Sequence, residues 1–281
     1  MEPGLNMSTR NQSRRSALKG ALVGVTGLAV VGGAVGAGVL FSEQSSQGAH
    51  AAAPNQATPV ANTQAITAIL NIAATAETLA VTFYSQVLSH ADKLGLKEAT
   101  RINLKATLVE EQLHLLFLNK QGAKSAAKNF SFPFGRDTFK NLELFLKTQQ
   151  QLESAFVAAY LAAVKELAML GRPDLAQVAA QLAAIESEHR VVGRLIGAML
   201  PIDNEAFPPL LLKNVAAAPA FLKGAGYLSP RNDNTFEFHA VLTRGAGVTM
   251  TMPTMVQTTT ITPAPTTPPI TNATPAAHLK F

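Results

Sequence analysis

The sequence predicts an all-α protein built on an antiparallel four-helix bundle with one long crossover. Three observations lead to this prediction. Four segments between residues 63 and 200 carry apolar residues at helical spacing, a motif of Glu followed by Glu-x-x-His occurs twice, and a stretch without helical period separates the two copies. Helices with apolar stripes must bury those stripes against one another, so four of them in succession predict a bundle.

The repeated motif has the spacing of metal ligands. Its residues are Glu77, Glu111 and His114 in the first copy and Glu153, Glu186 and His189 in the second. Residues three apart on a helix project from the same face, so each Glu-x-x-His places a carboxylate beside an imidazole. The first acid precedes the Glu-x-x-His by 34 positions in one copy and by 33 in the other. These near-equal intervals indicate a duplicated helix pair.

The four acids of the motif fall within apolar stripes. Glu77 shares its predicted face with Leu70 and Val81. Glu111 shares its face with Leu108 in the same way. An ionised carboxylate is costly to bury unless it is paired or bound to a metal, and these stripes contain no Lys or Arg. The sequence therefore predicts that the four acids and two histidines bind metal.

This pattern resembles the metal site of ferritin-like four-helix bundles, in which two helices each supply one Glu and two others each supply Glu-x-x-His. The flanking segments AETLAVTFY and EEQLHLLFL resemble the exported branch of that superfamily. The resemblance covers roughly residues 63–200 and implies two Fe or two Mn ions per chain. We expect Glu111 and Glu186 to bridge the ions, with His114 on one ion and His189 on the other.

Several residues beside the predicted ligands have two interpretations. Tyr84 and Tyr160 each lie seven positions after the first Glu of a motif copy. They are either core aromatics or redox-active, metal-adjacent phenols, and in the second case they are the candidate catalytic residues. Gln149 lies one turn before the acid of the third helix and is expected to orient it. Glu110 and Glu188 point away from the ligand faces and are expected to be solvated or to support a ligand.

The first two helices are predicted from start and stop signals. One runs from about Thr63 to His90 and the next from about Leu96 to Gln121, with a break between them at residues 92–95. So short a connection makes the two helices antiparallel. Residues 122–137 then reach about 50 Å when extended, which exceeds the roughly 39 Å of such a helix. They are expected to form the long crossover.

The second helix pair follows the crossover. The third helix is expected over about 138–170 and the fourth over about 173–200, ending before Pro201. Residues 201–248 mix prolines and glycines with short apolar runs. They are expected to form an irregular extension packed on the bundle, with one short helix near residues 216–222.

Both ends of the chain differ in composition from the bundle. Residues 1–53 contain Arg14-Arg15 ahead of an uncharged run and resemble a twin-arginine-type signal segment. Cleavage and export are favoured, and the alternative is an N-terminal membrane anchor, because the uncharged run is long enough to span a bilayer. Residues 54–62 form a polar linker. Residues 249–281 are rich in Thr and Pro and are expected to form a disordered tail.

Composition and charge exclude several functions. The chain has no cysteine, which excludes disulfides, thiolate ligands and iron–sulfur clusters. Its formal charge of +5 falls to +3 without the first 45 residues, so nothing indicates a nucleic-acid partner. The resemblance implies an oxidoreductase that handles dioxygen or hydrogen peroxide, through ferroxidase, oxidase, peroxidase or catalase-like chemistry.

Two other functions remain open at this stage. One is a non-catalytic cell-envelope protein, for example a stress or desiccation-related protein, in which the metal ions only hold the bundle together. The other is iron storage in a hollow homo-oligomer, which the extension of about 80 residues after the bundle disfavours. Activity towards ferrous iron and hydrogen peroxide distinguishes the three functions.

Overall fold

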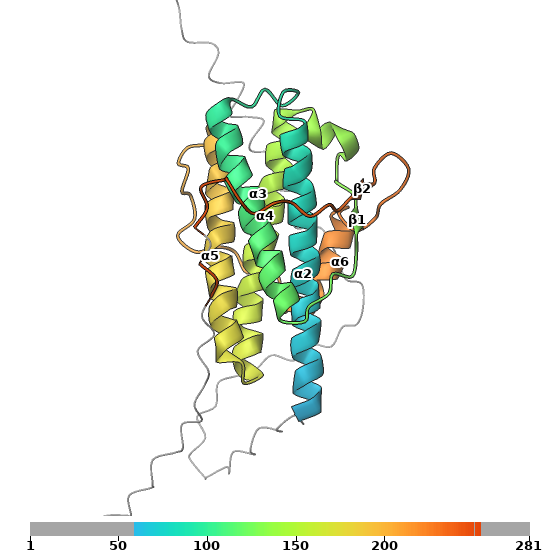
Figure 1. Ribbon diagram of the computed structural model, residues 1–281, viewed down its shortest axis with the longest axis vertical. Helices are drawn as coiled ribbons and strands as arrows, with labels where there is room; N and C mark the ends of the chain where they lie inside the picture. Colours follow the sequence, from blue (N-terminus) through green and yellow to red (C-terminus); the bar gives the residue numbers. More distant parts are fainter. Residues whose placement is uncertain (1–58, 250, 254–281) are drawn as a thin grey trace, which may run out of the picture. The chain divides into compact units, whose positions relative to one another are not determined.

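The computed structural model describes residues 59–249 and 251–253. Its main elements are α2 (Pro59–Ser89), α3 (Glu98–Lys120), α4 (Leu142–Met169) and α5 (Pro173–Ile196). In Figure 1, α2 and α3 form one antiparallel pair and α4 and α5 form the other. The predicted all-α four-helix bundle is therefore confirmed. The long connection returns along the bundle before α4 begins, so α3 and α4 run in the same direction (Figure 1).

The first helix is longer than predicted. It begins at Pro59, within the segment expected to be a linker, and not at Thr63. By length and composition its Asn62–Ser89 portion could cross a membrane, but 67% of its most apolar window is buried within the bundle. Burial to this extent is typical of the core helix of a bundle.

The third helix starts later than predicted, at Leu142. Residues Gly135–Phe139 form instead a 3-10 turn, η1. The Asn141 side chain then caps α4 by accepting hydrogen bonds from the backbone N–H groups of Glu143 and Leu144. Such a cap satisfies N–H groups that have no partner within the helix and fixes where the helix begins.

The fourth helix ends earlier than predicted. It stops at Ile196 and not at Leu200, because Ala198 adopts a left-handed conformation with φ of 49°. The backbone N–H of Met199 then donates to the carbonyl of Arg194, which closes the last turn. The chain turns at Ala198, before Pro201 can act as the stop signal.

The crossover and the C-terminal extension hold each other in place. The crossover contains β1 (Asn129–Phe130), which pairs antiparallel with β2 (Phe236–Glu237) of the extension. Asn234 strengthens this pairing, because its side chain both accepts from and donates to the backbone of Phe132 at 3.0 Å. The extension also contains the short turn η2 (Val215–Ala217) and the helix α6 (Ala218–Gly224).

An aromatic cluster joins these two segments to the bundle. The ring of Phe132 in the crossover lies 5.0 Å from that of Phe139, 5.1 Å from Phe236 and 5.6 Å from Phe83 on α2, measured between ring centroids. Tyr227 of the extension completes the cluster at 6.2 Å. Rings at such distances and tilts contribute about 0.5–1.5 kcal/mol per pair beyond their burial. The cluster therefore fixes the crossover against one side of α2.

Several sequence predictions lie outside the described residues. The chain divides after Pro54 into two units, and the described residues belong to the second. The signal segment 1–53, most of the linker and residues 254–281 of the tail are not described. Export, cleavage and membrane anchoring therefore remain predictions from the sequence.

Candidate metal centre

Six predicted ligand residues converge in the middle of the bundle. They are Glu77 on α2, Glu111 and His114 on α3, Glu153 on α4, and Glu186 and His189 on α5. All six are buried, with exposed fractions from 0% for three of the acids to 9% for His114. Each helix contributes at least one ligand-type side chain because the repeat places one acid on the inner stripe of every helix.

The six side chains form two overlapping groups. Glu77, Glu111, His114 and Glu186 form the first, and Glu111, Glu153, Glu186 and His189 form the second. Within each group the candidate ligand atoms lie within 4.8 Å of one another. Glu111 and Glu186 belong to both groups, so the arrangement could hold two metal ions that share two carboxylates.

Both histidines direct Nδ1 into the centre. The Nδ1 atom of His114 lies 3.3 Å from an oxygen of Glu111, 3.4 Å from Glu186 and 3.6 Å from Glu77. The Nδ1 atom of His189 lies 3.1 Å from Glu111 and 3.2 Å from Glu186. The two shared acids therefore lie between the two imidazoles, whose ring centroids are 6.3 Å apart.

The donor atoms fit a metal because most of them make no hydrogen bond, and their only close polar neighbours among the described residues belong to the same cluster. Among the described residues, these buried ligand atoms have no hydrogen bond: Glu77 Oε2, both carboxylate oxygens of Glu111, His114 Nδ1, Glu153 Oε2 and Glu186 Oε1. A buried polar atom without a partner is strongly unfavourable. Six of them that point to one place are what a cluster of cations would satisfy, so the residues present fit the expected metal ions.

Crowding shifts the protonation of these groups. Burial raises the pKa of Glu77 and of Glu153, and the charges of neighbouring carboxylates raise both further. Burial lowers the pKa of His114 and of His189, but the surrounding carboxylates outweigh it, so both pKa values rise above the ordinary range. Burial also acts to raise the pKa of Glu111, yet its contacts with both histidines hold it well below the usual range. Without cations the centre therefore retains protons.

The two tyrosines bind the unshared acids reciprocally. The Tyr84 hydroxyl on α2 donates to Glu153 on α4, and the Tyr160 hydroxyl on α4 donates to Glu77 on α2. Burial, followed by the nearby carboxylate charges, raises the pKa of both phenols. Both hydroxyls therefore keep their protons and can orient one oxygen of each acid. The structure places both tyrosines beside the candidate metal centre, while a redox or catalytic role remains a prediction.

One family profile matches this part of the chain: residues 66–197 match the profile described as "Ferritin-like domain". The bundle is a ferritin-like domain. The match covers most of α2, all of α3, α4 and α5, and all six candidate ligands. No curated protein and no solved structure matches the chain.

The two halves of the ferritin-like domain differ around the centre. Gln149 on α4 donates to the Tyr84 hydroxyl at 3.2 Å and to the carbonyl of His189 at 2.7 Å. Gln149 therefore reaches Glu153 through Tyr84, whose hydroxyl donates to that acid. The glycine at position 193 makes room for it, because a Cβ there would lie 1.9 Å from the Gln149 amide oxygen.

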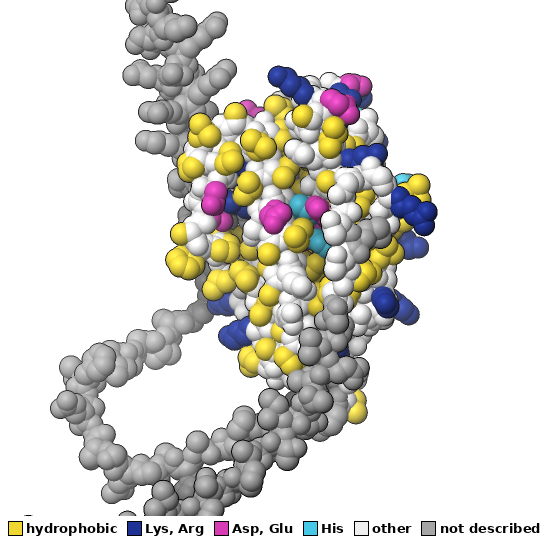
Figure 2. Space-filling model, turned by 60° about the vertical axis from the view of Figure 1, so that its left-hand side comes forward, with side chains coloured by type: hydrophobic (Ala, Val, Ile, Leu, Met, Phe, Trp, Pro, Cys, Tyr) yellow, Lys and Arg dark blue, Asp and Glu magenta, His cyan; other side chains and the backbone are white. Residues whose placement is uncertain are grey.

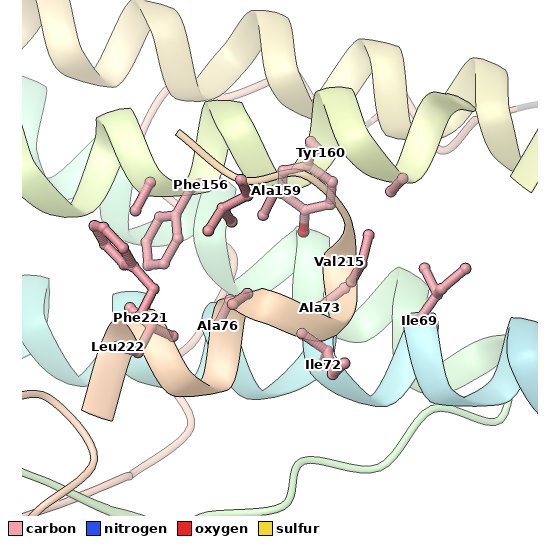
Figure 3. A pocket seen from close by; sticks show the side chains of 14 residues that line it. Ile69, Ile72, Ala73, Ala76, Phe156, Ala159, Tyr160, Val215, Phe221 and Leu222 are labelled. Atoms are coloured by element: carbon pink, nitrogen blue, oxygen red, sulfur yellow. The ribbon is translucent and has the colours of Figure 1, made fainter. Parts of the chain in front are cut away.

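The equivalent position in the first half is occupied differently. Ala73 precedes its acid by four positions, as Gln149 does in the other half. A small apolar cavity of about 20 Å³, shown from close by in Figure 3, lies beside Ala73 and Tyr160 and is covered by α6 and η2. Tyr160 consequently lacks the amide partner that Tyr84 has in Gln149.

A second difference concerns the histidines. Glu110, which is half-buried on α3, places an oxygen 2.9 Å from Nε2 of His189. A carboxylate on the outer nitrogen of a ligand histidine fixes its tautomer and orientation. Ile185 is the equivalent residue in the other copy, so the corresponding carboxylate is replaced by an alkyl side chain. The sequence signal for this role was the acid pair Glu110-Glu111. Glu188, by contrast, is exposed.

The centre is reached from outside between α3 and α5. A cavity of about 810 Å³ lies there, and Glu110 and His114 are among its lining residues. Figure 2 shows this face, on which acidic and histidine side chains lie close together among hydrophobic ones. Sequence reasoning did not find this cavity, because it depends on the separation of two helices and on the path of residues 247–249 and 251–253, which cover it in part.

Proposed function

We propose that this ferritin-like domain binds two Fe or Mn ions and uses them to react with dioxygen or hydrogen peroxide outside the cytoplasm. The supporting observation is the convergence of six buried ligand atoms without hydrogen-bonding partners. Four carboxylates and two imidazoles are donors suited to Fe or Mn. In this proposal Glu77 and His114 hold one ion, Glu153 and His189 hold the other, and Glu111 and Glu186 are shared.

A bound pair of such ions supplies the two-electron exchange with dioxygen or peroxide. The protein's residues prepare the site for it. Four carboxylates balance the four positive charges of two divalent ions. Glu110 accepts from Nε2 of His189, which leaves Nδ1 free to bind, and the two tyrosines hold the unshared acids in orientation. The apolar side chains packed around the centre keep bulk water out, which strengthens these electrostatic interactions.

The cavity between α3 and α5 favours a reactive centre over a purely structural one. A structural metal site is usually closed by its ligands, whereas a reactive one keeps an open approach. Here His114 lines a cavity large enough for small molecules, and Glu110 lies beside it. A non-catalytic envelope protein would not require this opening.

Export is the part of the proposal that rests on sequence alone. Arg14-Arg15 ahead of an uncharged run supports transport by a twin-arginine route. Replacing both arginines with Lys is expected to leave the full-length precursor in the cytoplasm. Unchanged export of this variant would contradict the route. If the N-terminus of the exported protein is Met1 or Met7, the signal segment is not cleaved and is instead expected to anchor the protein in the membrane.

The decisive experiment measures metal content and reaction on the same sample. The purified protein is loaded with Fe²⁺ or Mn²⁺, and bound metal is counted by elemental analysis. We expect two ions per chain, oxidation of Fe²⁺ under air, and faster loss of hydrogen peroxide than with free metal. Glu111→Gln is expected to abolish paired occupancy, and Glu188→Gln, at an exposed position on α5, serves as the matched control.

The outcomes separate the competing functions. Two bound ions with neither Fe²⁺ oxidation nor peroxide loss would mean that the metals are structural. A stoichiometry near zero in the native protein, or an unchanged stoichiometry in the Glu111→Gln variant, would mean that the repeated motif is not a working metal site.

A further inference from the structure

The cavity between α3 and α5 has the size of a small-molecule site. Its volume of about 810 Å³ lies within the range of roughly 300–1,000 Å³ that ligand pockets occupy. Two helices of the bundle form its walls and residues 247–249 and 251–253 form part of its cover. Dioxygen, peroxide or a metal ion would need only a small fraction of this space. The cavity therefore has room for an organic molecule beside the candidate metal centre.

The lining of this cavity is mainly apolar. Its hydrophobic residues include Leu113 and Phe117 on α3, Val178, Leu182 and Ile185 on α5, and Met252 in the cover. Besides Glu110 and His114, its polar side chains are the amides of Gln177 and Gln181 and the hydroxyls of Thr249 and Thr251. An apolar wall with a small number of hydrogen-bonding groups recognises an organic ligand by shape and by one or two polar contacts.

The charges around the cavity select against anions. Among the described residues that line it, none is Lys or Arg, and Glu110 is an acid. In Figure 2 the Lys and Arg side chains lie mostly towards the margins of this face. The positive charge that His114 can carry is already compensated by the carboxylates of Glu77, Glu111 and Glu186 around its Nδ1. An anionic ligand would therefore lose its hydration without gaining a free counter-charge. A neutral ligand suffers no such penalty.

The cavity reaches the His114 half of the candidate centre and not the His189 half. His114 lines it, whereas His189 is 2% exposed and is covered by Glu110. The side chain of Ile185 occupies the place that an acid would take in the other half and lines the same cavity. A ligand seated here would have its polar group directed at Glu110 and His114 and its apolar body between α3 and α5.

We propose that this cavity binds a neutral, largely apolar organic molecule with a hydrogen-bonding group, next to the His114 side of the candidate metal centre. Only the role of this molecule as a co-substrate of the metal centre rests on the proposed function. Binding itself depends on the shape and charge of the cavity and can be measured with or without metal.

The test uses two probes that differ in charge. At pH 7, 2-naphthol is neutral and 2-naphthoate is anionic, although both contain the same ring system. Calorimetric titration of the full chain is expected to show saturable binding of one 2-naphthol per chain. Binding of 2-naphthoate should be at least about tenfold weaker, which corresponds to roughly 1.4 kcal/mol. Equal affinity for the two probes would overturn the proposed charge selection.

Two pairs of variants locate the binding site. Leu113→Trp fills the cavity and should weaken 2-naphthol binding at least about tenfold, whereas Leu116→Trp, on the exposed face of the same helix, should not. Gln181→Arg places a cation at the exposed rim and should strengthen 2-naphthoate binding, whereas Ala184→Arg, outside the lining, should not. The gain of binding in Gln181→Arg cannot result from misfolding. If Leu113→Trp leaves 2-naphthol binding unchanged and Gln181→Arg leaves 2-naphthoate binding unchanged, the assigned site is wrong.

Failure of this proposal is distinguishable from failure of the proposed function. Bound metal is counted on each sample before titration. No saturable 2-naphthol binding in a protein that holds two ions per chain would overturn the ligand site and leave the metal function standing. Binding of 2-naphthol to a protein that takes up no metal would support the cavity assignment while the metal function failed.

Discussion

Two histidines with the same sequence motif have different surroundings, and a single carboxylate makes the difference. Glu110 lies on the outer nitrogen of His189, while Ile185 is its counterpart near His114. His189 is therefore the more rigidly oriented ligand of the two. His114, which lines the cavity, is the one with room to respond to a molecule that enters.

Replacing Glu110 with Ala tests this difference. We expect metal affinity at the His189 side to fall about 10- to 100-fold, because the imidazole loses the partner that fixes its tautomer. Competition with a chelator of known affinity measures the change. Glu188→Ala removes an equally charged, exposed acid from α5 and is expected to leave affinity unchanged. Equal losses in the two variants would show that net charge, and not the contact with His189, is responsible.

The convergence of the six candidate ligands could be predicted from the sequence, because the helical period fixes the direction of each side chain. The six side chains of the repeated motif are brought together in the structure as the spacing required. A supporting role for Glu110 was one of two expectations, but its contact with His189 could not be predicted, since that contact depends on how α3 and α5 are rotated against each other. The same applies to Gln149, whose link to Glu153 passes through Tyr84.

At the scale of elements, α4 and α5 approach each other closely where Gln149 meets Gly193. The amide of Gln149 crosses from one helix to the backbone of the other and also holds Tyr84. A glycine in the middle of a helix costs about 1 kcal/mol relative to Ala. Glycine nevertheless fits this position, because a Cβ here would overlap the Gln149 amide oxygen.

Gly193→Ala should therefore destabilise the protein despite the higher helix propensity of alanine. We expect a loss of about 1–3 kcal/mol in the free energy of unfolding, as for other overpacked core sites. Denaturant titration measures it. The double variant Gly193→Ala with Gln149→Ala removes the clashing amide and should recover part of the loss. If the single variant is as stable as the parent protein, the two helices have space that the structure does not show.

Long helices and short strands differed in how well the sequence predicted them. Each bundle helix has many apolar residues in register, so its existence was clear and only its ends shifted. The ends depend on single residues, such as the cap at Asn141 and the left-handed Ala198. The pairing of β1 with β2 joins two-residue strands that lie about a hundred positions apart, and so short a strand has no detectable period.

At the scale of the whole molecule, folding buries the acids of the candidate centre, so the stability of the fold depends on whether these acids bind protons or metal. Four acids and two histidines from all the bundle helices meet in the core, and among the described residues no Lys or Arg side chain forms an ion pair with them. Without metal the fold must retain protons to remain neutral there. With metal the same residues connect all four helices to one cluster, so stability should depend on pH in opposite ways in the two states.

For the metal-free protein we expect stability to fall as pH rises from about 5 to 8. Burial and neighbouring carboxylates raise the pKa values of Glu77 and Glu153 above that of a free glutamate, and the surrounding carboxylates raise those of His114 and His189 above that of a free histidine. The folded state therefore binds more protons than the unfolded state. Stability then decreases with pH wherever the folded state holds the excess. Glu111 has the opposite sign, but its contribution is lost only below about pH 4.5, outside this window.

For the protein loaded with Mn²⁺ we expect the reverse. Metal ions displace the retained protons, so binding tightens as pH rises. At a free metal concentration 100 times the Kd, binding adds about 2.7 kcal/mol per site, and each kcal/mol raises Tm by roughly 2–4 °C in a domain of this size. Thermal unfolding between pH 5 and 8, with Mn²⁺ or with a chelator, should therefore give Tm values that diverge as pH rises. Parallel curves would mean that Mn²⁺ displaces no protons from the converging carboxylates and histidines, and the assignment of a metal centre would have to be abandoned.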